Sequence, residues 1–365
     1  MTAVQQSATD RERATAEPLD TRSLLQRCPT WVLVAASVAV LACSAVTAIG
    51  LGPLRIPFTE VYAVLADAAM PWAGIDSGAS FARHEVVLGI RAPRVVLAII
   101  VGSGLPVAGA IIQAILRNPL ADPYLIGVST GAGLGAVASL LFAALIPVWL
   151  GQPLAAFAGS MLAFGLVIGL ARRRSGQLTP IRLVLAGVAV AAFLAALTQW
   201  LIISASDEGT IRQALTWLLG SLTSVQFDQM PIPAIAVAVG LTAGLAASGW
   251  LDALALGEEA AQSIGVDIAR FRWTMVSLSA AVVGTLVSVS GAIGFVALIV
   301  PHAVRLLVGS AHRRLLPLAA IWGATFLVWA DVLARTVRPG VEIPLGVVTA
   351  LVGAPVFLSI LRRTG

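Results

Sequence analysis

The chain has 365 residues, of which 58% are hydrophobic and only 11% are charged, and its formal net charge is +5. A soluble domain of ordinary composition carries roughly 25% charged residues, so this composition excludes a normal water-soluble protein and indicates a polytopic membrane protein. At about 20 residues for each spanning helix, the chain has room for on the order of ten spans.

Residues 1–30 are polar and of mixed charge, which predicts a disordered N-terminal tail on the cytoplasmic side. The remainder, residues 31–365, is predicted to form one transmembrane domain. It contains ten apolar segments, each a candidate membrane-spanning helix. They lie at about 31–50, 95–116, 124–148, 154–171, 183–203, 231–250, 273–291, 293–309, 315–334 and 344–361.

The placement of basic residues fits ten spans with both termini inside. All 23 basic residues are arginine, and with this topology sixteen of them fall in inside loops and seven in outside loops. Removing one early span would place Arg172–Arg174 or Arg313–Arg314 outside, against the positive-inside rule. The basic charge therefore records topology and gives no reason to expect a nucleic-acid partner.

Two loops are too long to be simple turns. Residues 51–94, outside, include a weakly amphipathic piece near Phe58–Met70, and residues 251–272, inside, are polar. The glycines between Gly127 and Gly135 sit within an apolar span, where small residues let helices approach closely.

Residues for catalysis are scarce. The histidines His84, His302 and His312 do not pair at metal-ligand spacing, and no lysine is present for a Walker nucleotide-binding motif or a Schiff base. The predicted spans are almost free of acidic residues apart from Asp331, near a span end, which disfavours an intramembrane enzyme and a proton-driven carrier. We therefore expect no catalytic residue, no metal site and no cofactor on this chain.

The inside loop contains an acidic segment that predicts a short helix ended by a glycine. It can be interpreted as a surface connector, but its position and pattern resemble the segment through which ABC-importer permeases contact their ATPase. The residues concerned are Leu256, Gly257, Glu258, Glu259, Ala260, Ala261 and Gly265.

Four further motifs carry a closer resemblance. They are Arg91-Ala-Pro-Arg94; Arg117-Asn-Pro-Leu-Ala-Asp-Pro123 leading into Gly127-Val-Ser-Thr-Gly131; Gly291-Ala-Ile-Gly294 through Pro301-His302; and Ala330-Asp331 through Arg335 with Glu342-Ile-Pro344 and Gly353-Ala-Pro355. In this order they resemble the FecCD family, the permease subunits of type II ABC importers for iron-siderophores, haem and vitamin B12. The family's first motif usually has leucine where this chain has Ala92.

The resemblance implies an all-α fold like that of the vitamin B12 importer permease, with ten transmembrane helices in the bacterial cytoplasmic membrane. It implies a second permease subunit, identical or paralogous, an extracytoplasmic substrate-binding protein, and two ATPase subunits that bind ATP and Mg. By motif position, Arg91 and Arg94, with Arg335 as a third, would receive acidic residues of the binding protein. Alternatively, Arg91 and Arg94 anchor a helix end, and Arg335 pairs with Asp331 four residues before it.

The segment containing Asn118, Pro119, Asp122 and Pro123 predicts an inside turn that breaks a helix. Whether it lines a gate or only shapes the bend stays open at this point. The expected function is ATP-driven import of an iron(III)-siderophore by alternating access, with haem or cobalamin as alternative substrates. A secondary transporter or channel ranks lower, because it gives no role to the polar inside loop or the outer arginines.

Overall fold

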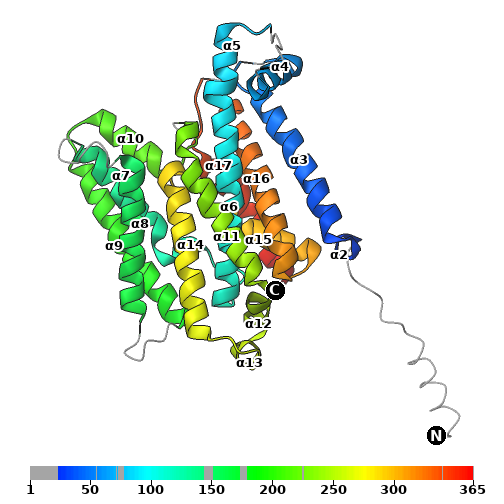
Figure 1. Ribbon diagram of the computed structural model, residues 1–365. Coiled ribbons are helices and arrows are strands. Elements are labelled where there is room, and N and C mark those ends of the chain that lie inside the picture. The colour runs from blue at the N-terminus through cyan, green and yellow to red at the C-terminus, as the bar shows by residue number, and fades with distance from the viewer. Residues whose placement is uncertain are drawn as a thin grey trace, which may run out of the picture.

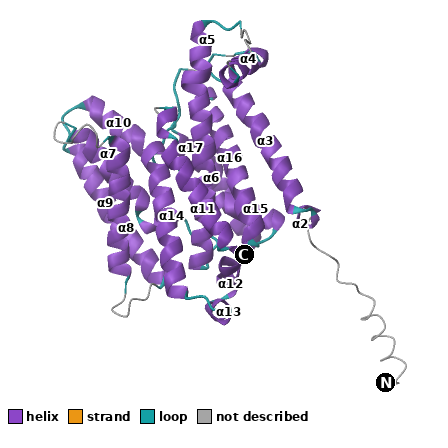
Figure 2. Cartoon of the chain, in the orientation of Figure 1, coloured by secondary structure: helices purple, strands orange, loops and turns teal. Residues whose placement is uncertain are grey.

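The computed structural model describes residues 24–364 apart from 55, 71, 73–77, 144–150, 173–178, 224–225 and 339. Within these residues the regular structure is entirely helical, with loops between the helices and no strand (Figure 2). The predicted tail lies mostly outside the described residues, as do Arg55, Arg173 and Arg174.

Each of the ten predicted apolar segments contains a helix. Among the residues that the structure describes, seven helices are long and apolar enough to cross a membrane, and shorter apolar helices occupy Val128–Leu141, Val296–Val308 and Leu345–Ser359. The chain is thus a multi-pass membrane protein, while ten crossings and the location of the termini stay predictions. The helices are α2 (Leu24–Arg27), α3 (Thr30–Gly50), α4 (Phe58–Ala69), α5 (Phe81–Glu85), the π-helical η2 (Val86–Arg91), α6 (Ala92–Leu116), the 3-10 turn η3 (Pro123–Ile126), α7 (Val128–Leu141), α8 (Gln152–Ala171), α9 (Pro180–Ile203), α10 (Glu208–Leu218), the 3-10 turn η4 (Phe227–Gln229), α11 (Pro231–Ala246), α12 (Ser248–Leu256), α13 (Glu258–Ser263), α14 (Ile268–Ser290), α15 (Val296–Val308), α16 (His312–Thr336) and α17 (Leu345–Thr364).

The helices differ from the sequence prediction in two places. The predicted span 231–250 is divided between α11 and α12, and the predicted outside connector after residue 203 contains the amphipathic helix α10. Asp207 begins α10, because its carboxylate accepts a hydrogen bond from the Thr210 amide at 2.7 Å. Helix α4 confirms the amphipathic piece predicted near Phe58–Met70.

Helix α6 is the centre of the bundle, and almost all of its residues are buried. It packs most extensively against α16 and also contacts α11, α14 and α15, whereas α7, α8 and α9 form a second group that α14 joins to the first (Figure 1). At the α6–α16 crossing, a Cβ on Gly102 would lie 2.5 Å from the Gly323 carbonyl oxygen. Only glycine permits this approach, and close backbone packing is the main attraction between helices in lipid.

The peripheral helix α3 is attached to α16 by side-chain hydrogen bonds. Trp322 donates to the Ser37 hydroxyl at 2.9 Å, and Trp329 donates to the Ser44 hydroxyl at 3.1 Å. Before α3, the Arg314 guanidinium donates to the carbonyl oxygens of Gln26 and Cys28 at 2.9 and 2.8 Å. Most of α3 is otherwise uncovered by the rest of the chain.

The two ends of the bundle differ in charge. Helices α6 and α8 end, and α9, α14 and α16 begin, at the end that carries α12 and α13, at the bottom of Figure 1. We call this end the arginine-rich face, after Arg117, Arg172, Arg182, Arg270 and Arg314. The other end, with α4, α5 and α10, is the opposite face.

Candidate functional site

The predicted short helix on the arginine-rich face is confirmed as α13, six residues long. Gly257 separates it from α12 with φ of 146°, a backbone conformation that residues with a side chain rarely adopt. At the other end, the Gly265 amide donates to the Gln262 carbonyl at 2.9 Å, with φ of 82°. Gly265 therefore follows the end of α13 as predicted, and the structure adds Gly257 as the break before its first residue.

One side of α13 is attached to the bundle and the other is exposed. Ala261 is fully buried, and Glu258 forms an ion pair at 2.9 Å with Arg272, which lies buried in α14. Glu259 is exposed and has no ion pair or hydrogen bond within the described part of the chain, and Leu256 just before the helix is 82% exposed. The helix thus presents an acidic and apolar surface from a fixed position.

The predicted helix-breaking turn after α6 is confirmed. Arg117 ends α6 in the left-handed conformation with φ of 50°, and the Asn118 amide donates back to the Gln113 carbonyl at 3.0 Å. The Asn118 side chain then accepts from the Leu120 amide at 2.9 Å. Arg117, Asn118 and Pro119 border a hollow of about 540 Å³ on the arginine-rich face, beside Leu256.

The second half of this turn leads into the interior. Asp122 accepts a hydrogen bond from the Tyr124 amide at 2.8 Å and so begins η3, in which Pro123 occupies the first position. A gating role for the turn stays a prediction.

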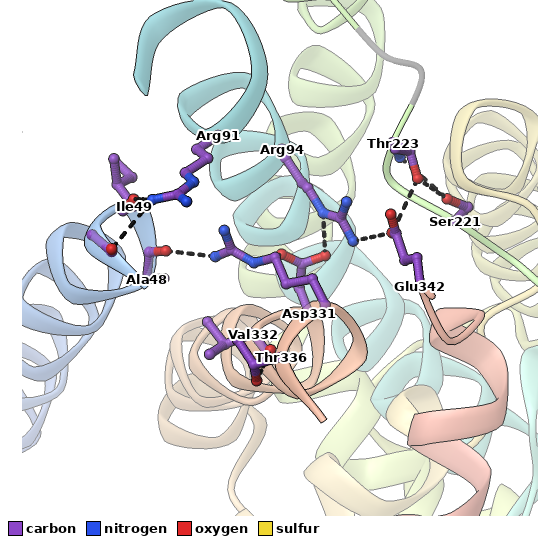
Figure 3. Close-up of polar contacts among 12 residues, drawn as sticks. Ala48, Ile49, Arg91, Arg94, Ser221, Thr223, Asp331, Val332, Thr336 and Glu342 are labelled. Carbon is purple, nitrogen blue, oxygen red and sulfur yellow. Dashed lines mark hydrogen bonds and ion pairs between the residues drawn. The ribbon is translucent and has the colours of Figure 1, made fainter. Parts of the chain in front are cut away.

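The three arginines predicted to receive a binding protein lie near the opposite face, and they are buried. Arg91, Arg94 and Arg335 are 4%, 6% and 7% exposed. Arg94 pairs with Asp331 at 2.5 Å and with Glu342, while Arg335 approaches the other oxygen of Asp331 at 3.3 Å (Figure 3). The pairing of Asp331 with Arg335 was expected from their spacing. The pairing of Arg94 with Asp331 and with Glu342 was not expected.

The remaining donors of this cluster bind the end of α3. Arg91 donates to the carbonyl of Ile49 at 2.8 Å, and Arg335 donates to the Ala48 carbonyl at 2.5 Å (Figure 3). Arg91 also donates to the Leu54 carbonyl, in the loop that follows α3. The last carbonyls of a helix have no partner within the helix, so two arginines here satisfy them. Arg91 and Arg335 thus tie the end of α3 to the neighbouring helices, while anchoring of Arg91 and Arg94 at the membrane interface stays a prediction. Docking by the three arginines stays a prediction.

Glu342 is the member of this cluster nearest to solvent. Its side chain is 36% exposed, against 1% for Asp331, and it also accepts from the Thr223 hydroxyl at 3.2 Å. Sequence reasoning recorded Glu342 only as part of a motif. Nothing local to it indicates a partner 248 residues earlier in the chain. We call Arg91, Arg94, Asp331, Arg335 and Glu342 the arginine cluster.

No group of three or more histidine, cysteine, aspartate or glutamate side chains gathers in the described ranges to hold a metal ion. The features brought together are instead an all-helical membrane bundle, an exposed acidic helix on one face and a buried arginine cluster near the other. These features define a polytopic helical membrane protein.

Comparison with known proteins gives its family. Residues 38–363 match the FecCD transport family. The chain is 40% identical over 296 residues to the Fe(3+) dicitrate transport system permease protein FecD of Escherichia coli K12, covering 80% of this chain and 91% of that protein. It is 43% identical over 279 residues to the cobalamin import system permease protein BtuC of Halobacterium salinarum, covering 76% and 74%. The chain therefore belongs to the FecCD transport family.

Two further similarities bear on substrate and fold. The hemin transport system permease protein HmuU of Yersinia pestis is 38% identical over 285 residues, covering 77% of this chain and 84% of that protein. A solved structure described as an inward-facing metal-chelate type ABC transporter superposes with a TM-score of 0.77 at 28% identity, covering 91% of this chain and 99% of that chain. The chain thus shares the fold of that transporter, and its relatives differ in the cargo that their names record.

Proposed function

We propose that this chain is the membrane permease subunit of a type II ABC importer in the cytoplasmic membrane. In this proposal a separate chain hydrolyses ATP, and α13 transmits the resulting movement. The observation that carries the proposal is the geometry of α13, a short helix fixed by Ala261 and Glu258 that leaves Glu259 and Leu256 free to contact another protein.

Substitution of Glu259 tests this role. Glu259→Arg reverses a charge on the exposed side of α13 without touching the Glu258–Arg272 pair, so the protein should insert normally while substrate uptake falls at least tenfold. The matched control is Asp228→Arg, an exposed charge reversal on the opposite face, which should leave uptake unchanged. Normal ATP-dependent uptake by Glu259→Arg would count against the proposal.

We propose an iron(III)-siderophore as the substrate, with haem and cobalamin as the alternatives. Support comes from the relatives, whose names include an iron(III)-dicitrate permease, a hemin permease and a cobalamin permease. Cells that lack the permease, with and without this chain restored, should be compared for uptake of labelled ferric siderophores, haem and cobalamin. Uptake that survives ATP depletion but collapses with the proton gradient would favour a secondary transporter instead.

Docking of a substrate-binding protein at the arginine cluster is a further part of the proposal. The three arginines already have internal partners, so a carboxylate from outside must take the place of one of them. Glu342 is the partner that can be displaced with least loss, because it is the most exposed carboxylate of the cluster. Docking would then exchange one carboxylate on Arg94 for another, and a second permease copy or paralogue would complete the transport pathway.

A further inference from the structure

Two apolar segments of this chain begin with a stretch that is not α-helical, and we call each such stretch an interruption. Before α7 the chain passes through Asp122–Gly127, and before α15 it passes through Gly291–Phe295. The helices that follow have only 14 and 13 residues, too few to cross a membrane core. Non-helical backbone at membrane depth persists only where its polar groups find partners within the protein.

For Ile293, in the second interruption, the hydroxyl of Tyr124 supplies such partners. It donates to the Ile293 carbonyl at 3.0 Å and accepts from the Ile293 amide at 3.1 Å. One side chain from the first interruption thus satisfies both peptide groups of a residue in the second. Ile293 is 1% exposed, so water does not replace the hydroxyl. Phenylalanine in place of Tyr124 would preserve the ring and remove both bonds.

Each interruption is also held against a different helix. Gly187 of α9 lies so close to the first that an added Cβ would be 1.7 Å from the Leu125 carbonyl oxygen. Gly109 of α6 lies so close to α15, just after the second, that a Cβ would be 1.9 Å from the Ala297 carbonyl oxygen. The Tyr124 hydroxyl therefore joins the α7–α8–α9 group to the group around α6.

The second interruption is under local constraint. Gly291 has φ of 66°, and Phe295 has φ of 69°, a left-handed conformation that costs energy for a residue with a large side chain. Such a conformation persists where surrounding contacts impose it, and the two hydrogen bonds from Tyr124 lie between these positions. Loss of the hydroxyl would free the segment to adopt another path.

We propose that Tyr124 is a positioning residue of the transport cycle, and that its hydroxyl is a latch that closes on Ile293 in the resting conformation and opens when the two helix groups move apart. The inference rests on the proposed function, because it needs a cycle driven by ATP. Without the latch, the resting conformation loses two buried hydrogen bonds and becomes less populated relative to the others.

The composition offers a matched control. The chain has only two tyrosines, and the other, Tyr62 on α4, is 60% exposed. The permease should be purified with its ATPase subunits and placed in lipid nanodiscs as wild type, Tyr124→Phe and Tyr62→Phe. We expect Tyr124→Phe to raise ATP hydrolysis without binding protein about fivefold and to lower uptake per ATP hydrolysed, while Tyr62→Phe matches the wild type. Wild-type coupling in Tyr124→Phe would overturn the latch.

A second measurement leaves the latch intact and is therefore independent of whether Tyr124→Phe folds. Tyr62→Phe labelled with 3-fluorotyrosine has a single fluorine site in the permease, at Tyr124. Its ¹⁹F resonance in the ATPase complex, with the ATPase unlabelled, should shift between the nucleotide-free state and the state trapped with Mg-ATP and vanadate. An unchanged resonance in a complex that hydrolyses ATP would overturn the latch alone. Failure of the permease to associate with an ATPase would overturn the proposed function instead.

Discussion

The arginine-rich face and the arginine cluster differ in how far their charged side chains are exposed to solvent. On α13, Glu258 is tied to the bundle while Glu259 next to it is left free at the surface. In the cluster, three arginines and Asp331 are almost completely buried, and Glu342 alone reaches the solvent. A charged motif at the end of a helical bundle can therefore be an exposed surface for another protein or a set of buried ion pairs within the chain. The exposed fraction of its side chains tells the two apart.

The strongest test of this difference is removal of the shared counterion in the cluster. Asp331→Ala would leave Arg94 and Arg335 buried without a carboxylate between them, at a cost of about 3–5 kcal/mol. We expect a large loss of thermal stability in detergent and little folded protein in the membrane. Asp228→Ala, exposed on the same face, should be indistinguishable from the wild type in the same thermal scan.

Glu258→Ala tests the ion pair on the arginine-rich face. Its ion pair is partly exposed, so its loss should cost at most about 1 kcal/mol. Because the pair also fixes the orientation of α13, we expect uptake to fall several-fold although stability barely changes. A loss of stability as large as that of Asp331→Ala would mean that the Glu258–Arg272 pair stabilises the fold as strongly as the ion pairs of the arginine cluster do.

Glu342→Gln tests whether the cluster can exchange partners. Removing this charge leaves Arg94 paired with Asp331 and available to an outside carboxylate, so binding protein should bind the permease a few-fold more tightly. The affinity can be measured by surface plasmon resonance in nanodiscs, with Glu60→Gln as control, because Glu60 pairs with Arg83 on the same face but outside the cluster. Weaker binding by Glu342→Gln would mean that Glu342 itself contributes to the docking surface.

The sequence predicted the features that depend on composition along a short stretch. Apolar segments of about 20 residues located the helices, and Gly265 correctly predicted the end of α13 because its effect is local. Apolar windows do not reveal where a helix starts within them, so the interruptions at Asp122–Gly127 and Gly291–Phe295 were assigned to spans or to their edges. Helix α10 was missed because it is amphipathic rather than apolar, although Asp207 is a recognisable beginning.

The arginine cluster shows where local reasoning ends. The motif identified Arg91, Arg94 and Arg335 as a set, and the four-residue spacing correctly suggested that Asp331 pairs with Arg335. It did not show that Asp331 also binds Arg94, which lies 237 residues away in the chain. Burial of an arginine depends on such distant partners. The motif therefore selected three arginines that lie together in the fold, but it did not predict that they are buried.

The attachment of α3 has a consequence for the order of synthesis. Its hydrogen-bond partners Trp322 and Trp329 are made 285 residues after the serines they bind, and Arg335 comes 287 residues after Ala48. At a synthesis rate of about 5–20 residues per second, α3 waits roughly 15–60 s for these partners. During that interval α3 is held by the lipid, which suits its mean hydropathy of 2.5, and by Arg91, which follows Ile49 by 42 residues. Its contacts with α16 form only when the chain is nearly complete.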